Sequence, residues 1–174
     1  GFESLASISV GANNTAFGFR ALRSNTTASN NTAIGTNTLL NSIGTANTAV
    51  GNNALYSNTG GNLNAAFGAS SLISNTTGSM SVAFGVNSML YNTTGSRSAA
   101  FGAYTGYNPF NNIAQYRVTT DMGLVLMGYG ATKNNASAIT NAIAIGYGAH
   151  VTDSNMAVLG STSILTTLLR GNVG

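Results

Sequence analysis

A short pattern of one small residue, one large apolar residue and one glycine recurs along the first hundred positions of the chain. Six copies are regular, and their glycines are separated by 17, 16, 17, 17 and 17 residues. The regular copies occupy residues 16–18, 33–35, 49–51, 66–68, 83–85 and 100–102, and looser copies occupy 126–128, 144–146 and 158–160. A nearly constant period of this length is typical of a repeat architecture.

Each repeat predicts two short strands joined by turns. The residues one and three positions before the glycine would share one face of the first strand, and the small residue between them would face the other way. A second apolar residue, preceded by a small one, comes four positions after the glycine, and we assign it to the second strand. These residues are Leu22, Leu39, Leu55, Leu72 and Met89. The turn segments, such as 24–27 and 92–95, are rich in Asn and Thr, whose side chains can bond nearby backbone.

Stacking of such coils would bring equivalent residues into ladders at the usual strand spacing of about 4.8 Å. We expect the large apolar residue before each glycine to form a buried column in a narrow interior. The small residues between them would then form a flat outer surface that another chain could approach. The expected core column comprises Phe17, Ile34, Val50, Phe67, Phe84 and Phe101.

The pattern predicts an all-β fold, a parallel β-roll or β-solenoid with about 17 residues per coil. We expect a lead-in at 1–13, regular repeats at 14–102, an insertion at 103–122, further coils at 123–160 and a transition segment at 161–174. One coil of this size encloses a thin core, and small cores are marginally stable. We therefore expect burial to be completed between chains, in a closed homo-oligomer with cyclic symmetry.

Composition supports an ordered, elongated molecule. Only 5% of residues are charged, against about a quarter in an average soluble protein. Hydrophobic residues make up 43% and recur in register, which argues against disorder.

The net charge of +3 comes from scattered basic residues, so we expect no nucleic-acid partner. No run approaches the roughly 20 apolar residues of a membrane helix. The chain opens without a signal sequence, and we expect it to be part of something longer.

Residues that could support catalysis are scarce. The acids are Glu3, Asp121 and Asp153, and the single histidine is His150. A glycosidase needs two carboxylates about 5–10 Å apart, which isolated acids supply only where subunits meet. His150 and Asp153 could share a metal with symmetry-related copies, but a solvated corner is the better interpretation. We therefore expect no enzyme activity, cofactor or metal.

The insertion holds the best candidates for ligand binding. Its aromatic rings and planar side-chain donors are of the kind that sugar binding uses, and exposed aromatic residues are common interface anchors. The candidates are Tyr104, Tyr107, Phe110, Asn111, Asn112, Tyr116 and Arg117. A simpler interpretation, which we favour, is that they pack against a neighbouring subunit or cap the roll.

Residues 81–88, Ser-Val-Ala-Phe-Gly-Val-Asn-Ser, and residues 141–149 resemble the head repeats of YadA-like trimeric autotransporter adhesins. The longer form, with Ala-Leu-Tyr-Ser-Asn-Thr at 54–59, is similar to the repeats of bacteriophage tail fibres and related surface fibres. The resemblance spans residues 14–174 apart from the stretch between Gly102 and Gly128. It implies a parallel homotrimer of left-handed β-rolls, extracellular, on a virion tail fibre or a bacterial surface. The 17-residue period and the Phe before the glycine differ from the shorter adhesin repeat.

These observations favour a structural or adhesive fibre segment that supports attachment to a host or surface without catalysis, with copies of itself as partners. A carbohydrate-binding domain that recognises a host-surface glycan or protein receptor through 103–122 is one alternative. A second alternative is an ice-binding solenoid, which would need an aligned, exposed threonine column. The column that starts with Thr15, Thr32 and Thr48 changes to Ala65 and Val82, which disfavours that alternative.

Overall fold

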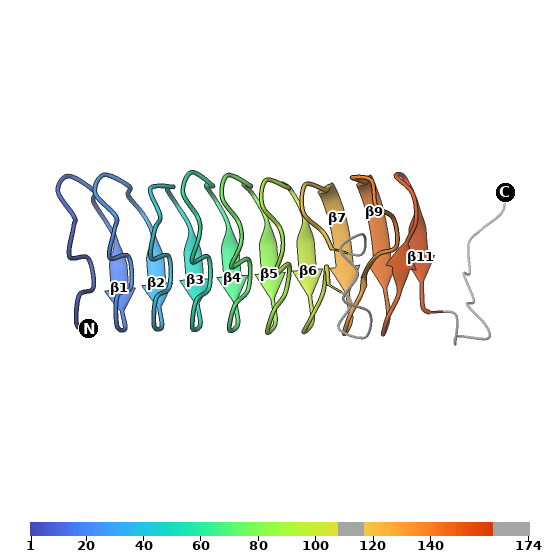
Figure 1. The fold of residues 1–174 in the computed structure, drawn as a ribbon, viewed down its shortest axis with the longest axis horizontal. Coiled ribbons are helices and arrows are strands. Elements are labelled where there is room, and N and C mark those ends of the chain that lie inside the picture. The colour runs from blue at the N-terminus through green and yellow to red at the C-terminus, as the bar shows by residue number, and fades with distance from the viewer. Residues whose placement is uncertain (108–116, 162–174) are drawn as a thin grey trace, which may run out of the picture.

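The computed structural model describes residues 1–107 and 117–161, which form an all-β solenoid of about eight turns with about 17 residues per coil. The coils follow one another along the long axis of the molecule (Figure 1). One nine-stranded sheet runs through them, in the order β1-β2-β3-β4-β5-β6-β7-β9-β11. Its strands are Thr15–Phe17 (β1), Thr32–Ile34 (β2), Thr48–Val50 (β3), Ala65–Phe67 (β4), Val82–Phe84 (β5), Ala99–Phe101 (β6), Met122–Met127 (β7), Thr140–Ile145 (β9) and Ala157–Leu159 (β11).

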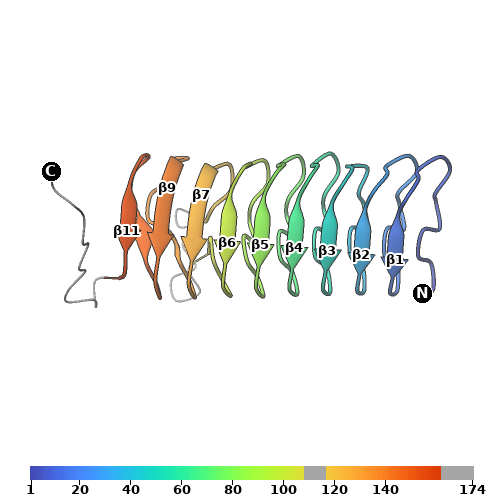
Figure 2. The same ribbon diagram turned by 180° about the vertical axis from the view of Figure 1, so that it is seen from behind.

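All neighbouring strands of this sheet are parallel and pair equivalent positions of successive repeats. Phe84, for example, lies opposite Phe67 on one side and Phe101 on the other. Seen from behind, the sheet continues without a break from β1 to β11 (Figure 2). The predicted solenoid and its stacked ladders are confirmed.

The two faces of the sheet are the reverse of those expected. The small residue at the centre of each strand is the buried one: Ala33, Ala49, Ala66, Ala83 and Ala100 have no exposed surface. The expected core column of Phe17, Ile34, Val50, Phe67, Phe84 and Phe101 lies on the outer face, and Phe17 is 73% exposed. The reason is the opposite wall of the coil, where Leu22, Leu39, Leu55, Leu72 and Met89 fill the interior and leave room only for alanine.

The predicted second strand is a turn in the regular coils. Leu22 has a left-handed φ of 51°, and Arg20, two residues earlier, has a φ of 57°. Ala21 and Leu22 are neighbours and both are fully buried, which the alternation of a flat strand does not allow. The turn still pairs with the next coil, since Leu22 N donates to Thr38 O at 3.0 Å. Only the later coils have strands at this position, Thr132–Lys133 (β8) and His150–Val151 (β10), which pair in parallel.

The glycine after each strand is required by both conformation and space. Gly85 has a φ of 133°, a region that L-residues with side chains rarely adopt. A Cβ atom there would lie 2.5 Å from the carbonyl carbon and oxygen of Gly102 in the next coil. Equivalent contacts recur at the other coil glycines, so the backbones stack at this corner without side chains between them.

Buried asparagines close the interior at the turns, as the turn composition suggested. Asn75 is fully buried, and its Nδ2 donates to Asn58 Oδ1 and to Gly78 O, both at 2.9 Å. Asn92 Nδ2 donates in turn to Asn75 Oδ1 at 2.8 Å. The ladder therefore satisfies polar backbone at corners that water does not reach.

Two predicted boundaries change. In the expected lead-in, Leu5 N donates to Ala21 O and Ser9 N to Thr26 O, so residues 1–13 already follow the coil path. At the expected insertion, β7 pairs in register with β6, and Thr93 N donates to Thr119 O at 2.8 Å. Residues 103–107 and 117–122 therefore belong to coils. Residues 108–116 and 162–174 lie outside the described residues.

Candidate functional site

The outer face of the nine-stranded sheet carries an unbroken column of large apolar side chains. We call it the apolar column: Phe17, Ile34, Val50, Phe67, Phe84, Phe101, Met127, Ile145 and Leu159. Phe84 is 42% exposed and Leu159 is 40% exposed, so the column remains accessible from the first strand to the last. The rings of Phe67, Phe84 and Phe101 stack along it, with centroid separations of 4.3 and 5.8 Å.

The surroundings of this column are also uncharged. None of the nine strands of this sheet that the structure describes contains a charged residue. Beside the column run uncharged residues that are half-buried or exposed, from Thr15 at one end through Val82 to Ile143. The result is a long, narrow, apolar surface of a kind that monomeric proteins rarely expose to solvent.

A second feature lies where the coils turn away from the sheet. Five tyrosines form a continuous row, which we call the tyrosine row: Tyr91, Tyr107, Tyr104, Tyr129 and Tyr147. Their ring centroids are 5.3, 6.1, 5.4 and 5.5 Å apart in that order. The five residues follow β5, β6, β7 and β9, which are adjacent in the sheet (Figure 1). The guanidinium of Arg117 lies over the Tyr91 ring at 3.9 Å from its centroid.

The structure thus brings together three of the predicted ligand-binding residues, Tyr104, Tyr107 and Arg117. The other four, Phe110, Asn111, Asn112 and Tyr116, lie outside the described residues. Sequence reasoning missed Tyr91, Tyr129 and Tyr147 because it searched only the expected insertion. The signal was present, since Tyr129 and Tyr147 each directly follow a coil glycine and therefore stack once the period is applied.

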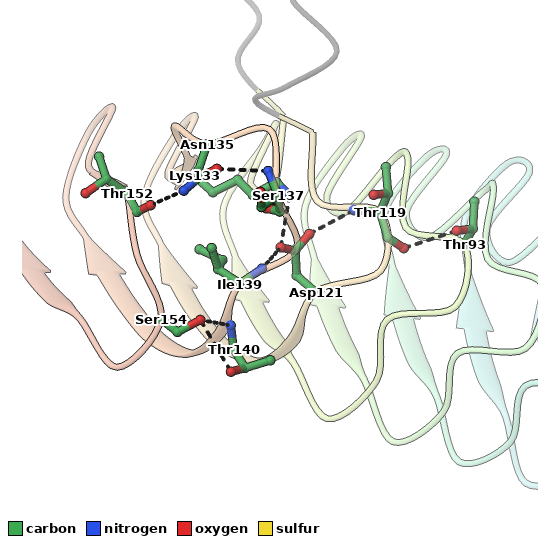
Figure 3. A network of polar contacts seen from close by, with 10 residues as sticks. All are labelled: Thr93, Thr119, Asp121, Lys133, Asn135, Ser137, Ile139, Thr140, Thr152 and Ser154. Atoms are coloured by element: carbon green, nitrogen blue, oxygen red, sulfur yellow. Dashed lines mark hydrogen bonds and ion pairs between the residues drawn. The ribbon is translucent and has the colours of Figure 1, made fainter.

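One ion pair is completely buried, near the coil that contains the long segment between Gly102 and Gly128. Lys133 Nζ donates to Asp121 Oδ1 at 3.0 Å, with the two side chains 2% and 0% exposed. Asp121 also accepts from Ile139 N at 2.7 Å and from Thr119 N at 3.1 Å (Figure 3). Every oxygen of this carboxylate is therefore engaged, and the pair ties three chain segments together.

The other two acids and the histidine have local partners. Glu3 pairs with Arg20 at 2.7 Å and with Arg23 at 3.0 Å. Asp153 is exposed and accepts from Thr152 Oγ1, and His150 Nδ1 lies 3.2 Å from Gly148 O. Across residues 1–107 and 117–161, no three His, Asp or Glu side chains are grouped in a way that could hold a metal ion.

Within the part of the chain that the structure describes, no helix has the length and hydrophobicity to cross a membrane. In comparisons with protein-family models, with curated proteins and with solved structures, none matches this chain.

Proposed function

We propose that this chain is a structural segment of an extracellular trimeric fibre, in which identical solenoids lie parallel and contact one another through the apolar column. The fibre would support attachment to a host or surface without chemistry of its own. The observation that carries this proposal is the apolar column, which is accessible along the whole sheet and lacks charge.

Burial of this surface would stabilise the assembly. Removing apolar area from water contributes about 25 cal/mol per Å². Parallel copies related by a cyclic axis would place each ladder against another ladder, so that contacts made by one coil repeat in the next. A monomer would instead leave seven of the nine column side chains exposed and the other two, Val50 and Phe67, half-buried.

The trimeric state is inferred from the sequence resemblance and not from the apolar column. The apolar column supports closed self-association in general, whereas three copies and left-handed winding follow from the resemblance of residues 81–88 and 141–149 to YadA-like head repeats. A host-facing role follows from the same resemblance.

Native mass spectrometry of the purified chain tests this proposal. We expect a mass three times that of the chain, and we expect Phe84→Glu together with Phe101→Glu to shift it to one chain while the β-sheet circular dichroism remains. The matched control is Met80→Arg, because Met80 is 53% exposed and Arg97 occupies the equivalent position one coil later. A parent protein that stays monomeric at micromolar concentration would remove the proposal.

A further inference from the structure

We propose that the tyrosine row is a binding surface for an extended oligosaccharide, which lies across the coils of β5, β6, β7 and β9. This inference does not depend on the fibre proposed above. It rests on the geometry of the five rings, on their exposure and on the charge around them.

The rings do not form a uniform stack, as the phenylalanines of the apolar column do. Adjacent phenylalanine rings there are inclined by 14°, which hides their faces against one another. In the tyrosine row, Tyr91 and Tyr107 meet at 67° and Tyr104 and Tyr129 at 57°. The end pair of Tyr129 and Tyr147 is nearly parallel, at 10°, but Tyr147 has no further ring of the row beyond it and is 64% exposed. Tilted neighbours leave parts of ring faces open, and a sugar ring packs its C–H face on such surfaces while its hydroxyl groups bond to polar side chains.

The accessible end of the row is formed by two residues. Tyr147 is 64% exposed and Tyr129 is 36% exposed, and their rings are stacked with a centroid separation of 5.5 Å. The other three tyrosines are half-buried. Five rings in sequence provide contacts for several sugar units, so the row fits a chain of sugars better than a single monosaccharide.

Other occupants fit the row less well. A peptide that adds a strand needs an exposed sheet edge, but β7 lies between β6 and β9 in the sheet. A second copy of this chain is better matched by the flat apolar column. Tyrosine provides a rigid ring and a polar hydroxyl at low entropic cost, which suits an amphipathic ligand.

Charge around the row is weakly positive. Arg117 lies over Tyr91, and the nearby acid Asp121 is buried in its pair with Lys133. The surface therefore accepts both neutral and acidic sugars, and repulsion of a carboxylated glycan is not expected.

A printed array of neutral and acidic glycans, probed with the intact chain, is the first test. The best binder is then titrated while tyrosine emission is recorded, which is feasible because the chain has no tryptophan and seven tyrosines in total. We expect Tyr147→Ala and Tyr129→Ala each to weaken binding about tenfold, and Tyr147→Phe to weaken it less because the ring remains.

The matched control is Tyr56→Ala. Tyr56 occupies the same coil position as Tyr107, five residues after the coil glycine, but lies outside the row, so binding should not change. Native mass is recorded for each variant, which separates loss of the ligand surface from loss of an oligomer. If Tyr147→Ala changes the native mass, the glycan affinity of Tyr91→Ala, at the opposite end of the row, is measured in its place. A parent chain that binds no glycan, or one whose affinity is unchanged by Tyr129→Ala and Tyr147→Ala, would overturn the inference.

Discussion

Single residues in this chain are selected by backbone conformation as strongly as by burial. Leu55, Leu72 and Met89 all have a φ of 50° and are fully buried. A left-handed conformation costs an L-residue about 1–2 kcal/mol, whereas burial of a leucine contributes about 1.5–3 kcal/mol. The repeat therefore tolerates strain at this position because the side chain fills the core.

Gly85→Ala is expected to destabilise the protein severely. The new Cβ would lie 2.5 Å from two backbone atoms of Gly102, at a φ of 133°. We expect a loss of about 3 kcal/mol or more in the free energy of unfolding, measured by urea titration. The control is Gly60→Ala, where the nearest atom would be Thr77 Cγ2 at 3.7 Å and the change should be small. Equal stability of the two variants would contradict the stacking of glycines.

The buried ion pair leads to an asymmetric prediction. Asp121→Ala leaves the buried ammonium of Lys133 without its counter-ion, with Ser137 O still accepting from it, and leaves the N–H groups of Thr119 and Ile139 without their side-chain acceptor. The change should cost about 3–5 kcal/mol. Lys133→Met should cost less, because both backbone donors still bond to Asp121 and the methionine fills most of the space. Thermal unfolding, monitored by circular dichroism, shows which of the two variants is less stable. A larger loss for Lys133→Met would show that the ammonium, not the carboxylate, organises this site.

At the scale of elements, each regular coil has one three-residue strand and relies on its turns for the rest of its pairing. The turns bond to the next coil through backbone groups, as Leu72 N does to Ser88 O at 3.0 Å. Side-chain ladders add to this where the corner is closed to water. The strand and the turns of each coil therefore both form hydrogen bonds with the neighbouring coil.

The asparagine ladder can be tested by replacing Asn75 with serine, which another coil of this chain has at the same position. Asn75→Ala would leave Asn58 Oδ1 without a partner and would remove one of the two hydrogen bonds made by Gly78 O and by Asn92 Nδ2, at a cost of about 1–3 kcal/mol. Serine stands at the same position in Ser42, where its Oγ accepts from Asn58 Nδ2 at 3.2 Å. We therefore expect Asn75→Ser to recover part of the loss in urea unfolding. No recovery would indicate that shape, not hydrogen bonding, matters there.

At the scale of the whole molecule, the solenoid is close to one-dimensional, since each coil contacts mainly its neighbours. Its stability should then be distributed over the coils and their interfaces, and its length should be adjustable in steps of one coil. The face that repeats, the apolar column, lengthens in the same steps.

Deletion of residues 69–85, one full coil, should preserve the fold. Gly68 would then precede Val86, as Gly85 does now, and the ladders on both sides would stay in register. We expect an unchanged circular dichroism signal per residue and a modest fall in melting temperature. Deletion of residues 69–77 removes about half a coil and should abolish cooperative unfolding. Equal behaviour of the two deletions would argue against stacked coils.

The order of amino acids alone determined the period, the coil length, the parallel stacking and the recurring positions of the glycine and of the second apolar residue. These follow from local spacing, because a ladder of stacked coils forms only where equivalent residues recur at a constant interval. The sequence also indicated Tyr104 and Tyr107 as surface residues of interest.

Only the tertiary structure decided which face of each strand is inside. Alternation defines two faces but does not label them, and the choice depends on what the opposite wall of the coil contributes. Because Leu39, Leu55 and their equivalents fill the interior, alanine faces them and phenylalanine is displaced outward. The tyrosine row likewise exists only once the coils are stacked, since its residues are separated by as many as 56 positions in the chain.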